Sequence, residues 1–482
     1  MTACYYPTDE LLEVHVVGSD GRIWVAWKDY NGLWAGNLHP LTAPDTLPPA
    51  TPITSASYPV NEQLEVFVGD ETWFARVLWK HHNGMWAPCV TPLGPRTGAM
   101  YVAAAETRRV AQVSATPDFL SAGVGGVDLG ANTSHGKEHF VFFGDVPRPK
   151  DVPGPVHDAD VVAQVVDFAQ DGVSLQVIRT AADGFFAPFT IRRLNRALPD
   201  LVPSTNQTPS GAFSDGAFVY VFVLLHDRPG PGWPDPVTHL TRSPNPASGK
   251  PFDEVFRWSE SKFLQVAPVV VDNASVPGLP SATGRGVVML GGGLIHPGRI
   301  DGGDGVHLAW MPLQRGVAPR LDEIWYHRGE AGWSAGDHDS AAAMWRLPGG
   351  YTSLSLTFVA DARRWVALYS RGSGFGDRNR PQGAVVARVA PSPTGPWSEE
   401  IPLFDPCREG AFGSFMHWPN LDDLDERDPS QQTGGTGHAY GAFVLEPLTG
   451  WREEDRTLTL HYLMSTFRPY QVHHMVSEFR ID

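Results

Sequence analysis

The chain alternates short apolar and polar runs, and one pattern occurs twice near its start. LEVHVVGSDGRIWVAWKDYNGLW at 12–34 aligns without a gap with LEVFVGDETWFARVLWKHHNGMW at 64–86, an offset of 52 residues. Each copy has two alternating runs separated by a turn, and each carries Asn-Gly close to its end, at 31–32 and 83–84. Alternation with a period of two and Asn-Gly turns are typical of antiparallel strands and tight hairpins. The pattern predicts two tandem β repeats within residues 1–97.

Beyond about Pro95–Gly98 the 52-residue period ends, and short apolar runs alternate with loops rich in glycine and proline. Strands are expected at 138–145, 160–168, 173–179, 217–225, 286–294, 305–311, 354–359, 364–370, 383–389, 440–446 and 457–464, and short helical turns at 191–197 and 319–325. Many short strands with aromatic-rich loops are typical of sandwiches and propellers. Because this part of the chain is too long for one sandwich, we predict an all-β protein in which residues 98–482 form a five-bladed β-propeller.

Two repeats are too few to close a ring of blades and would leave strand edges open. They either dock on the rest of the chain, pair with another protomer to give a homo-oligomer, or form a small sandwich. Over about residues 10–95 they resemble the blades of tryptophan-rich bacterial lectin propellers. The resemblance implies an appended carbohydrate-binding module. The alternative is a structural module whose tryptophans only fill a core.

Composition and charge narrow the classes of protein and of partner. Hydrophobic residues make up 42% and charged residues 19% of the chain, as in globular proteins. The formal net charge of -16 argues against nucleic-acid binding, which needs lysine and arginine to neutralise phosphates. The three cysteines form no CxxC pair, so neither a zinc site nor a disulfide framework is expected, although a single disulfide is left open.

The sequence leaves the cellular address of the protein open. No apolar run approaches the length of a membrane-spanning helix, so no membrane span is expected. The start, MTACYYPTDELLEV, lacks a basic segment followed by an apolar one, so no secretory signal is predicted. The protein then acts inside the cell, leaves it by a non-standard route, or had a leader that was trimmed.

The segment GVDLGANTSHGKEHFVFFGDV at 126–146 carries the most informative chemistry. Gly136-Lys137 lies between two alternating runs and predicts a two-residue hairpin turn. Without a bulge, such a hairpin places Asp128 directly opposite Asp145, and two like charges so placed are destabilising. One carboxyl group of the pair should therefore have a raised pKa. Glycoside hydrolysis needs one protonated and one ionised carboxyl group beside the bond that breaks. The alternative is that Asp145 only caps a turn.

The same segment resembles the first-blade signature of a bacterial family catalogued as domain of unknown function 4185. The signature of the family is roughly T-D-L-G, followed further along the chain by FFGDT. Further similar segments are HDADVVAQVVD at 157–167, SDGAFVYVFVLL at 214–225, HAYGAFVLE at 438–446 and LHYLMSTFRPYQVHHM at 460–475. The family resembles five-bladed furanosidase propellers, and some members are endo-D-arabinanases. The resemblance covers about residues 115–475.

The resemblance implies roles for particular residues. Asp128 and Asp145 are the expected catalytic carboxylates, with Asp145 as the general acid and Asp128 as the base or nucleophile. Asp160 is expected as a third carboxylate near the axis that contacts substrate. Sugar subsites need planar aromatic rings and bidentate donors, so four residues of these types at loops or strand ends are expected to bind substrate, namely Arg371, Trp418, Tyr440 and Tyr470.

No cofactor is expected. The 18 histidines form no HExxH motif or evenly spaced ligand set. A structural calcium ion, which some related propellers hold, is left open, although no loop demands one. Glu446 ends a predicted strand and is a candidate to supply a carboxylate of the site in place of one of the aspartates. Ser465 is not surrounded by the G-x-S-x-G motif of serine hydrolases, so it is not expected to be a catalytic nucleophile.

Three functions compete. The first is an endo-acting glycoside hydrolase on a furanoside polysaccharide such as D-arabinan. The second is a lectin-like propeller that binds carbohydrate without cutting it. The third is a secreted toxin or assembly component whose propeller is a docking platform. The aspartate pair favours the first, because a lectin has no need of two facing carboxylates.

Overall fold

A computed structural model gives the fold of the chain. It describes residues 1–481 apart from 7–10, 30, 45, 48, 50, 59–62, 70–74, 81–85, 87–90, 93–105, 148–158, 170, 204–206, 227–235, 293–304, 348–350, 372–382, 420–421, 425 and 431–434. The expected domain boundary at Pro95–Gly98 and the turn at 83–84 lie outside the described residues. In the described part, no helix has the length and apolar character needed to cross a membrane.

Each N-terminal repeat folds into a four-stranded antiparallel sheet. The first contains β1 (Thr2–Tyr6), β2 (Leu11–Val17), β3 (Ile23–Lys28) and β4 (His39–Pro40). The second contains β5 (Ile53–Tyr58), β6 (Gln63–Gly69), β7 (Ala75–Lys80) and β8 (Thr91–Pro92). The last three strands of the two sheets begin and end 52 residues apart, as the sequence repeat predicts.

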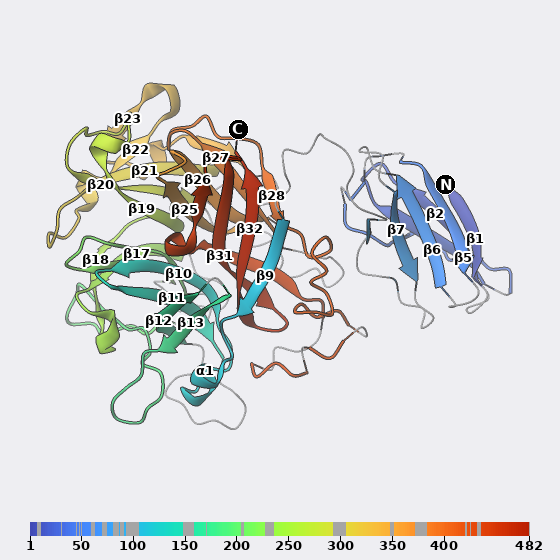
Figure 1. Cartoon of the computed structure of the whole chain (residues 1–482), viewed down its shortest axis with the longest axis horizontal. Coiled ribbons are helices and arrows are strands. Elements are labelled where there is room, and N and C mark those ends of the chain that lie inside the picture. The colour runs from blue at the N-terminus through green and yellow to red at the C-terminus, as the bar shows by residue number, and fades with distance from the viewer. Residues whose placement is uncertain are drawn as a thin grey trace.

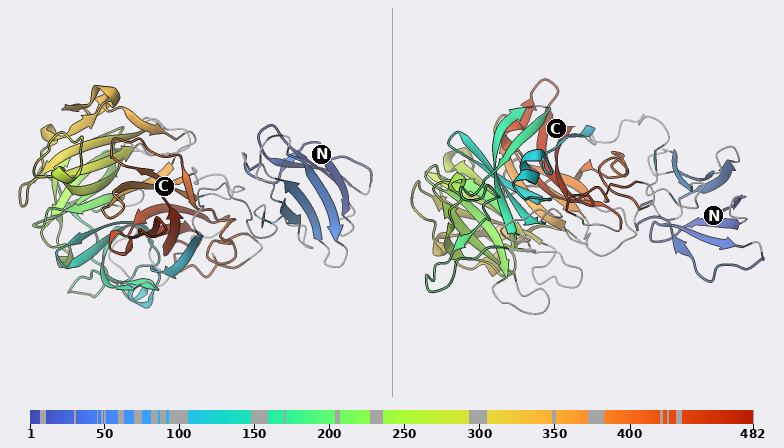
Figure 2. Two further views of the ribbon diagram at one scale, coloured as in Figure 1. Left: turned by 45° about the horizontal axis from the view of Figure 1, so that its top comes forward. Right: turned by 90° about the horizontal axis from the view of Figure 1, so that it is seen from below.

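The two N-terminal sheets pack on each other and lie apart from the rest of the chain (Figure 2). Their shared core contains the buried side chains of Val17, Ile23, Leu47, Leu64, Val66, Val68 and Leu78. A buried ion pair crosses the same interface, because Lys80 Nζ lies 2.9 Å from Glu13 Oε1. Within one chain the two repeats therefore form a small two-sheet sandwich, one of the arrangements left open by the sequence.

The part of the chain that follows the N-terminal repeats forms five antiparallel or mixed sheets, which are arranged one after another around a common centre (Figure 1). The first contains β10 (Asp128–His135), β11 (Glu138–Val146), β12 (Ala159–Ala169) and β13 (Gly172–Val177). The second contains β14 (Ile191–Arg192), β15 (Pro209–Ser214), β16 (Val219–His226), β17 (Pro236–Ser243) and β18 (Phe252–Arg257). The third contains β19 (Gln265–Asp272), β20 (Arg285–Gly292), β21 (Gly305–Leu313), β22 (Trp325–His327), β23 (Trp333–Ala335) and β24 (Ala343–Arg346).

The last two sheets complete this part of the molecule. The fourth contains β25 (Tyr351–Val359), β26 (Arg364–Arg371), β27 (Ala384–Ala390) and β28 (Ile401–Phe404). The fifth contains β29 (His438–Val444), β30 (Gly450–Arg452), β31 (Thr457–Phe467), β32 (Gln471–Arg480) and β9 (Glu106–Gln112). Because β9 precedes all the other strands of the five sheets and pairs with β32, the fifth sheet joins the beginning of this part of the chain to its end.

The strands β10, β15, β19, β25 and β29 contact one another in this order, and β29 contacts β10. They therefore surround a common axis, as the innermost strands of propeller blades do. Each sheet packs between two others, so the strands outside the axis are buried on both faces. This explains why Val219–Leu225 on β16 is a continuous apolar run rather than an alternating one. The predicted all-β, propeller-like architecture is confirmed, and the described residues contain five blade-like sheets.

The expected strands from 138–145 to 457–464 all overlap observed strands. The helical turn expected at 319–325 is present as a 3-10 turn over Leu321–Glu323. The one expected at 191–197 is wrong. Ile191–Arg192 forms the short strand β14, which pairs with β18, and bends and turns follow it. Pairing with a strand some 60 residues away overrides the local preference at this position.

Close packing around the axis predicts a large effect of one small substitution. A Cβ atom added at Gly211 on β15 would lie 2.1 Å from the backbone oxygen of Val266 on the next sheet. We expect Gly211→Ala to lower the free energy of unfolding by about 3 kcal/mol, because this backbone contact has no side chain that can yield. Gly450→Ala is the control, since nothing lies within 4 Å of a Cβ atom there. Equal melting temperatures for the two variants would contradict the packing of β15 on β19.

Candidate active site

The hairpin of β10 and β11 carries Asp128 and Asp145. Its turn is Gly136-Lys137, as expected, and Gly136 has a φ of 63°. Next to the turn the register is symmetric, from His135 opposite Glu138 to Ala131 opposite Phe142. This is the pairing that the two-residue turn predicts.

A bulge then shifts the register before it reaches the aspartates. Between Leu129 and Ala131 the pairing slips by one residue, so that Asp128 lies opposite Gly144 and not opposite Asp145. The prediction of a directly facing aspartate pair is therefore wrong. Leu129 and Gly130 have φ values of 63° and 144°, and the amide of Leu129 donates to Ser465 Oγ at 2.7 Å. A serine from the fifth sheet thus holds the bulge.

A second bulge sets the position of Asp145. The register of β11 and β12 shifts between Phe143 and Val146, and Asp145 has a left-handed φ of 47°. Its amide donates to Asp160 Oδ1 at 3.2 Å. Bulges re-aim side chains at the ends of strands. Here the bulge leaves the Asp145 side chain half-buried, beside an Asp160 with no exposed surface.

Asp128 lies in a closely fitted pocket with 6% of its surface exposed. The hydroxyl of Tyr440 donates to Asp128 Oδ2 at 3.0 Å, and the Tyr470 side chain also hydrogen-bonds this carboxyl group. A Cβ atom at Gly144 would lie 2.9 Å from Asp128 Oδ1, so glycine opposite Asp128 leaves the space that the carboxyl group occupies. Gly126 does the same for Tyr470, whose backbone oxygen would lie 2.6 Å from an added Cβ atom.

The three carboxyl groups interact electrostatically. Burial raises the pKa of Asp128 to about 6, although the hydrogen bonds from Tyr470 and Tyr440 act in the opposite direction. Burial also raises the pKa of Asp160 well above its ordinary value, and the charges of Asp145 and of Asp128 raise it further. Asp128 Oδ1 and Asp160 Oδ2 are buried without a hydrogen-bond partner among the described residues. The site therefore favours a proton on at least one of its carboxyl groups at neutral pH.

The structure brings together five of the seven residues predicted for the site. Asp128, Asp145, Asp160, Tyr440 and Tyr470 form one cluster, and the charges of Asp128 and Asp145 raise the pKa values of both tyrosines in addition to the effect of burial.

Arg371 and Trp418 have other contacts. Arg371 Nη1 lies 3.0 Å from Glu400 Oε2 in a partly exposed ion pair. The ring of Trp418 packs edge-on against Phe412, and its amide donates to Asp422 Oδ2. Neither contact joins them to the three aspartates.

Two supporting residues escaped the sequence analysis. Ser465, considered there only as a nucleophile, fixes the bulge of β10. Asp428 is buried and its Oδ2 accepts a 2.6 Å hydrogen bond from the amide of Tyr470. Both act across large sequence separations, so no local pattern reveals them. The motif around Ser465 was already part of the family resemblance, which was the one available indication.

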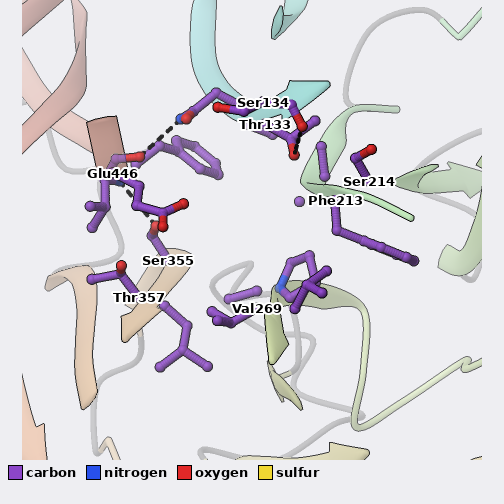
Figure 3. Close-up of a pocket in the computed structure, with 18 of the residues that line it drawn as sticks. Thr133, Ser134, Phe213, Ser214, Val269, Ser355, Thr357 and Glu446 are labelled. Atoms are coloured by element: carbon purple, nitrogen blue, oxygen red, sulfur yellow. Dashed lines mark hydrogen bonds between the residues drawn. The ribbon is translucent and has the colours of Figure 1, made fainter. Parts of the chain in front are cut away.

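A separate cavity of about 300 Å³ follows the axis. Figure 3 shows part of its lining, with Thr133, Ser134, Phe213, Ser214, Val269, Ser355, Thr357 and Glu446 labelled. On β10 its lining begins at Ala131, and none of the three aspartates lines it. Glu446 belongs to this cavity and not to the aspartate cluster. Among the described residues no group of three or more histidine, cysteine, aspartate or glutamate side chains is arranged to hold a metal ion.

The fold and site define an all-β, propeller-like protein with a buried carboxylate cluster. The model of the family described as "Domain of unknown function (DUF4185)" matches residues 114–476, and the chain belongs to this family. The match includes the five clustered residues. No curated protein matches the chain.

Several solved structures are similar to this chain at low identity. A glycosyl hydrolase from Bacteroides ovatus has 14% identity and a TM-score of 0.38, with 74% of this chain and 84% of that chain covered. A putative glycosidase from Bacteroides thetaiotaomicron has 12% identity and a TM-score of 0.42, with 78% and 97% covered. The BP39L lectin from Burkholderia pseudomallei has 11% identity and a TM-score of 0.24, with 84% and 98% covered. Likenesses of this size do not identify an activity.

The raised pKa of Asp128 predicts a pH-dependent gain in stability for Asp128→Asn. The folded protein holds the Asp128 proton more tightly than the unfolded chain, so ionisation of this group lowers stability as the pH rises from 3.8 to about 6. The variant lacks this cost. Above pH 6 we expect it to exceed the wild type by at most roughly 3 kcal/mol in free energy of unfolding, and to lose this advantage below pH 3.8.

Denaturant titrations at several pH values measure this difference. Asp361→Asn, which changes an exposed aspartate in a turn, is the control. An advantage of Asp128→Asn that does not vary with pH would show that Asp128 titrates normally in the folded protein.

Proposed function

We propose that the chain is a glycoside hydrolase that cuts a furanoside polysaccharide such as D-arabinan. The observation that carries the proposal is the buried cluster of Asp128, Asp145 and Asp160, which combines a raised pKa with two tyrosine hydrogen bonds. Glycoside hydrolysis needs one carboxyl group that donates a proton and one that stays ionised. A protein that only binds sugar gains nothing from gathering three mutually repelling acids, two of them buried.

The surroundings of each group suggest its role. Asp128 accepts hydrogen bonds from Tyr440 and Tyr470, which stabilise its ionised form and orient it. A carboxylate with a pKa of about 6 is both ionised and appreciably basic at neutral pH, which suits a general base. Asp145 is the most exposed of the three and lies beside two other acids, so it is the natural proton donor. Asp160 has no exposed surface and acts as a positioning residue through the Asp145 amide.

These roles give a balanced reaction. Asp145 delivers its proton to the glycosidic oxygen as the bond from that oxygen to the anomeric carbon breaks. Asp128 removes a proton from the water whose oxygen bonds to the anomeric carbon. The products are a sugar hemiacetal and the alcohol of the leaving chain, and the proton passes from Asp128 through solvent back to Asp145.

The substrate class rests on the motifs. VDLG at 127–130 and FFGDV at 142–146 resemble the first-blade signature of the family, some of whose members are endo-D-arabinanases, and the family match covers both segments. The N-terminal repeats, which resemble lectin blades, would hold the enzyme on a carbohydrate surface.

Loss of either proposed catalytic carboxylate should abolish product release. We expect Asp145→Asn and Asp128→Asn each to lower kcat by about 10²- to 10⁴-fold, the usual contribution of a general acid or base. The assay follows oligosaccharides released from arabinogalactan, with other polysaccharides in parallel. Asp361→Asn is the control for an exposed aspartate. Binding of arabinogalactan by the wild type without any released product would instead favour a non-catalytic lectin.

The activity should also fall on the acid side of neutrality. Because the proposed base must be ionised, kcat/KM should drop as the pH falls through about 6 and become half-maximal near that value. The measurement is a pH profile of kcat/KM over a range in which the circular dichroism spectrum is constant. A profile that is flat through this pH would contradict the role of Asp128.

A further inference from the structure

The two N-terminal repeats bury opposite faces of equivalent strands. In β2 the buried side chains are Glu13, His15 and Val17, whereas in β6 they are Leu64, Val66 and Val68, the equivalents of Leu12, Val14 and Val16. Because successive side chains of a strand point to opposite faces, the repeats are not related by a face-to-face twofold axis. We call the face that carries Glu13, or its equivalent Glu65, the glutamate face, and the opposite face, which carries Lys28 or Lys80, the lysine face. The first repeat buries its glutamate face, and the second buries its lysine face.

The contact between these faces is specific. The glutamate face of the first repeat, with Glu13, His15 and Val17, packs on the lysine face of the second, with Leu64, Val66, Val68, Leu78 and Lys80. Glu13 and Lys80 are 2% and 5% exposed and form the 2.9 Å ion pair across the contact. At the edge, Thr2 Oγ1 of the first repeat lies 3.2 Å from Ser55 Oγ of the second.

The arrangement leaves the complementary pair of faces unused. The lysine face of the first repeat consists of Leu12, Val14, Val16, Ala26 and Lys28, all only partly buried. The glutamate face of the second repeat contains Glu65 and Phe67, which are also partly buried. Lys28 and Glu65 occupy the positions of Lys80 and Glu13, and neither forms an ion pair with a described residue. No described strand of the five propeller sheets packs closely on either face.

We propose that these two faces bind each other between copies of this chain, with Lys28 of one copy pairing with Glu65 of the next. The charges are complementary, and the contact inside each chain already shows that the two kinds of face fit. A contact between different faces of identical subunits is head-to-tail and closes into a ring when the rotation allows it. Propellers usually have four to eight blades, so two-bladed modules close a ring with two to four copies. The inference does not depend on the proposed activity.

The mass of the full-length chain in solution tests the proposal. Light scattering coupled to size-exclusion chromatography should give two to four times the protomer mass of 52.6 kDa. Lys28→Glu and Glu65→Lys should each raise the dissociation constant about tenfold or more, because either change opposes two like charges in a desolvated contact. The double variant Lys28→Glu/Glu65→Lys should reassociate, since the exchanged charges again pair between copies.

Two controls separate this pairing from other effects. Lys250→Glu makes the same change in net charge as Lys28→Glu, at an exposed residue of the propeller part, and should leave the mass unchanged. Unchanged circular dichroism and melting of the variants would show that the fold is intact. A monomeric wild type, an oligomer insensitive to both single changes, or a double variant that stays dissociated would each overturn the proposal.

Discussion

Three aspartates share a site from which water is largely excluded, so their charges cannot all be present at little cost. Burial raises the pKa of Asp128 to about 6 in spite of the hydrogen bonds from its tyrosines, and the charges of its neighbours add to the effect of burial at Asp160. The fold holds this arrangement with two bulges, two buried tyrosines and a glycine opposite Asp128. Together these features place acids of different proton affinity side by side. That difference is what acid-base chemistry on a glycosidic bond requires.

The site also depends on how the propeller closes. Asp128, Asp145 and Asp160 come from the first sheet, whereas Tyr440, Tyr470 and Ser465 come from the fifth. These sheets are adjacent because the ring closes, and β9 ties the fifth sheet to the segment that precedes the first. The carboxylate cluster therefore forms only in the completed fold, between the beginning and the end of the propeller part. The N-terminal sandwich follows a different rule, since its two repeats use complementary faces and leave one face of each kind available.

Local pattern was sufficient for much of the architecture. The 52-residue repeat predicted the N-terminal strands. The Gly136-Lys137 turn predicted the register of β10 and β11 up to Ala131 opposite Phe142, because the register next to a turn depends on short-range turn chemistry. The bulge between Leu129 and Ala131 was not predictable from the hairpin, since it is stabilised by Ser465, which lies 336 residues after Leu129. Arg371 was placed near the site on residue type and strand end alone, but Glu400 offers it a nearby partner. Tyr440 and Tyr470 were expected on the same ground as Arg371, but as sugar-binding aromatic rings, because nothing in their local sequence indicates contact with Asp128.

The distribution of protons among the three aspartates is the central claim, and neutron diffraction from crystals in deuterated buffer at neutral pH observes it directly. The account predicts deuterons on the carboxyl groups of Asp145, the proposed proton donor, and of Asp160, with Tyr440 donating its deuteron to an ionised Asp128. Three ionised carboxylates, or aspartates that point into separate regions, would contradict it.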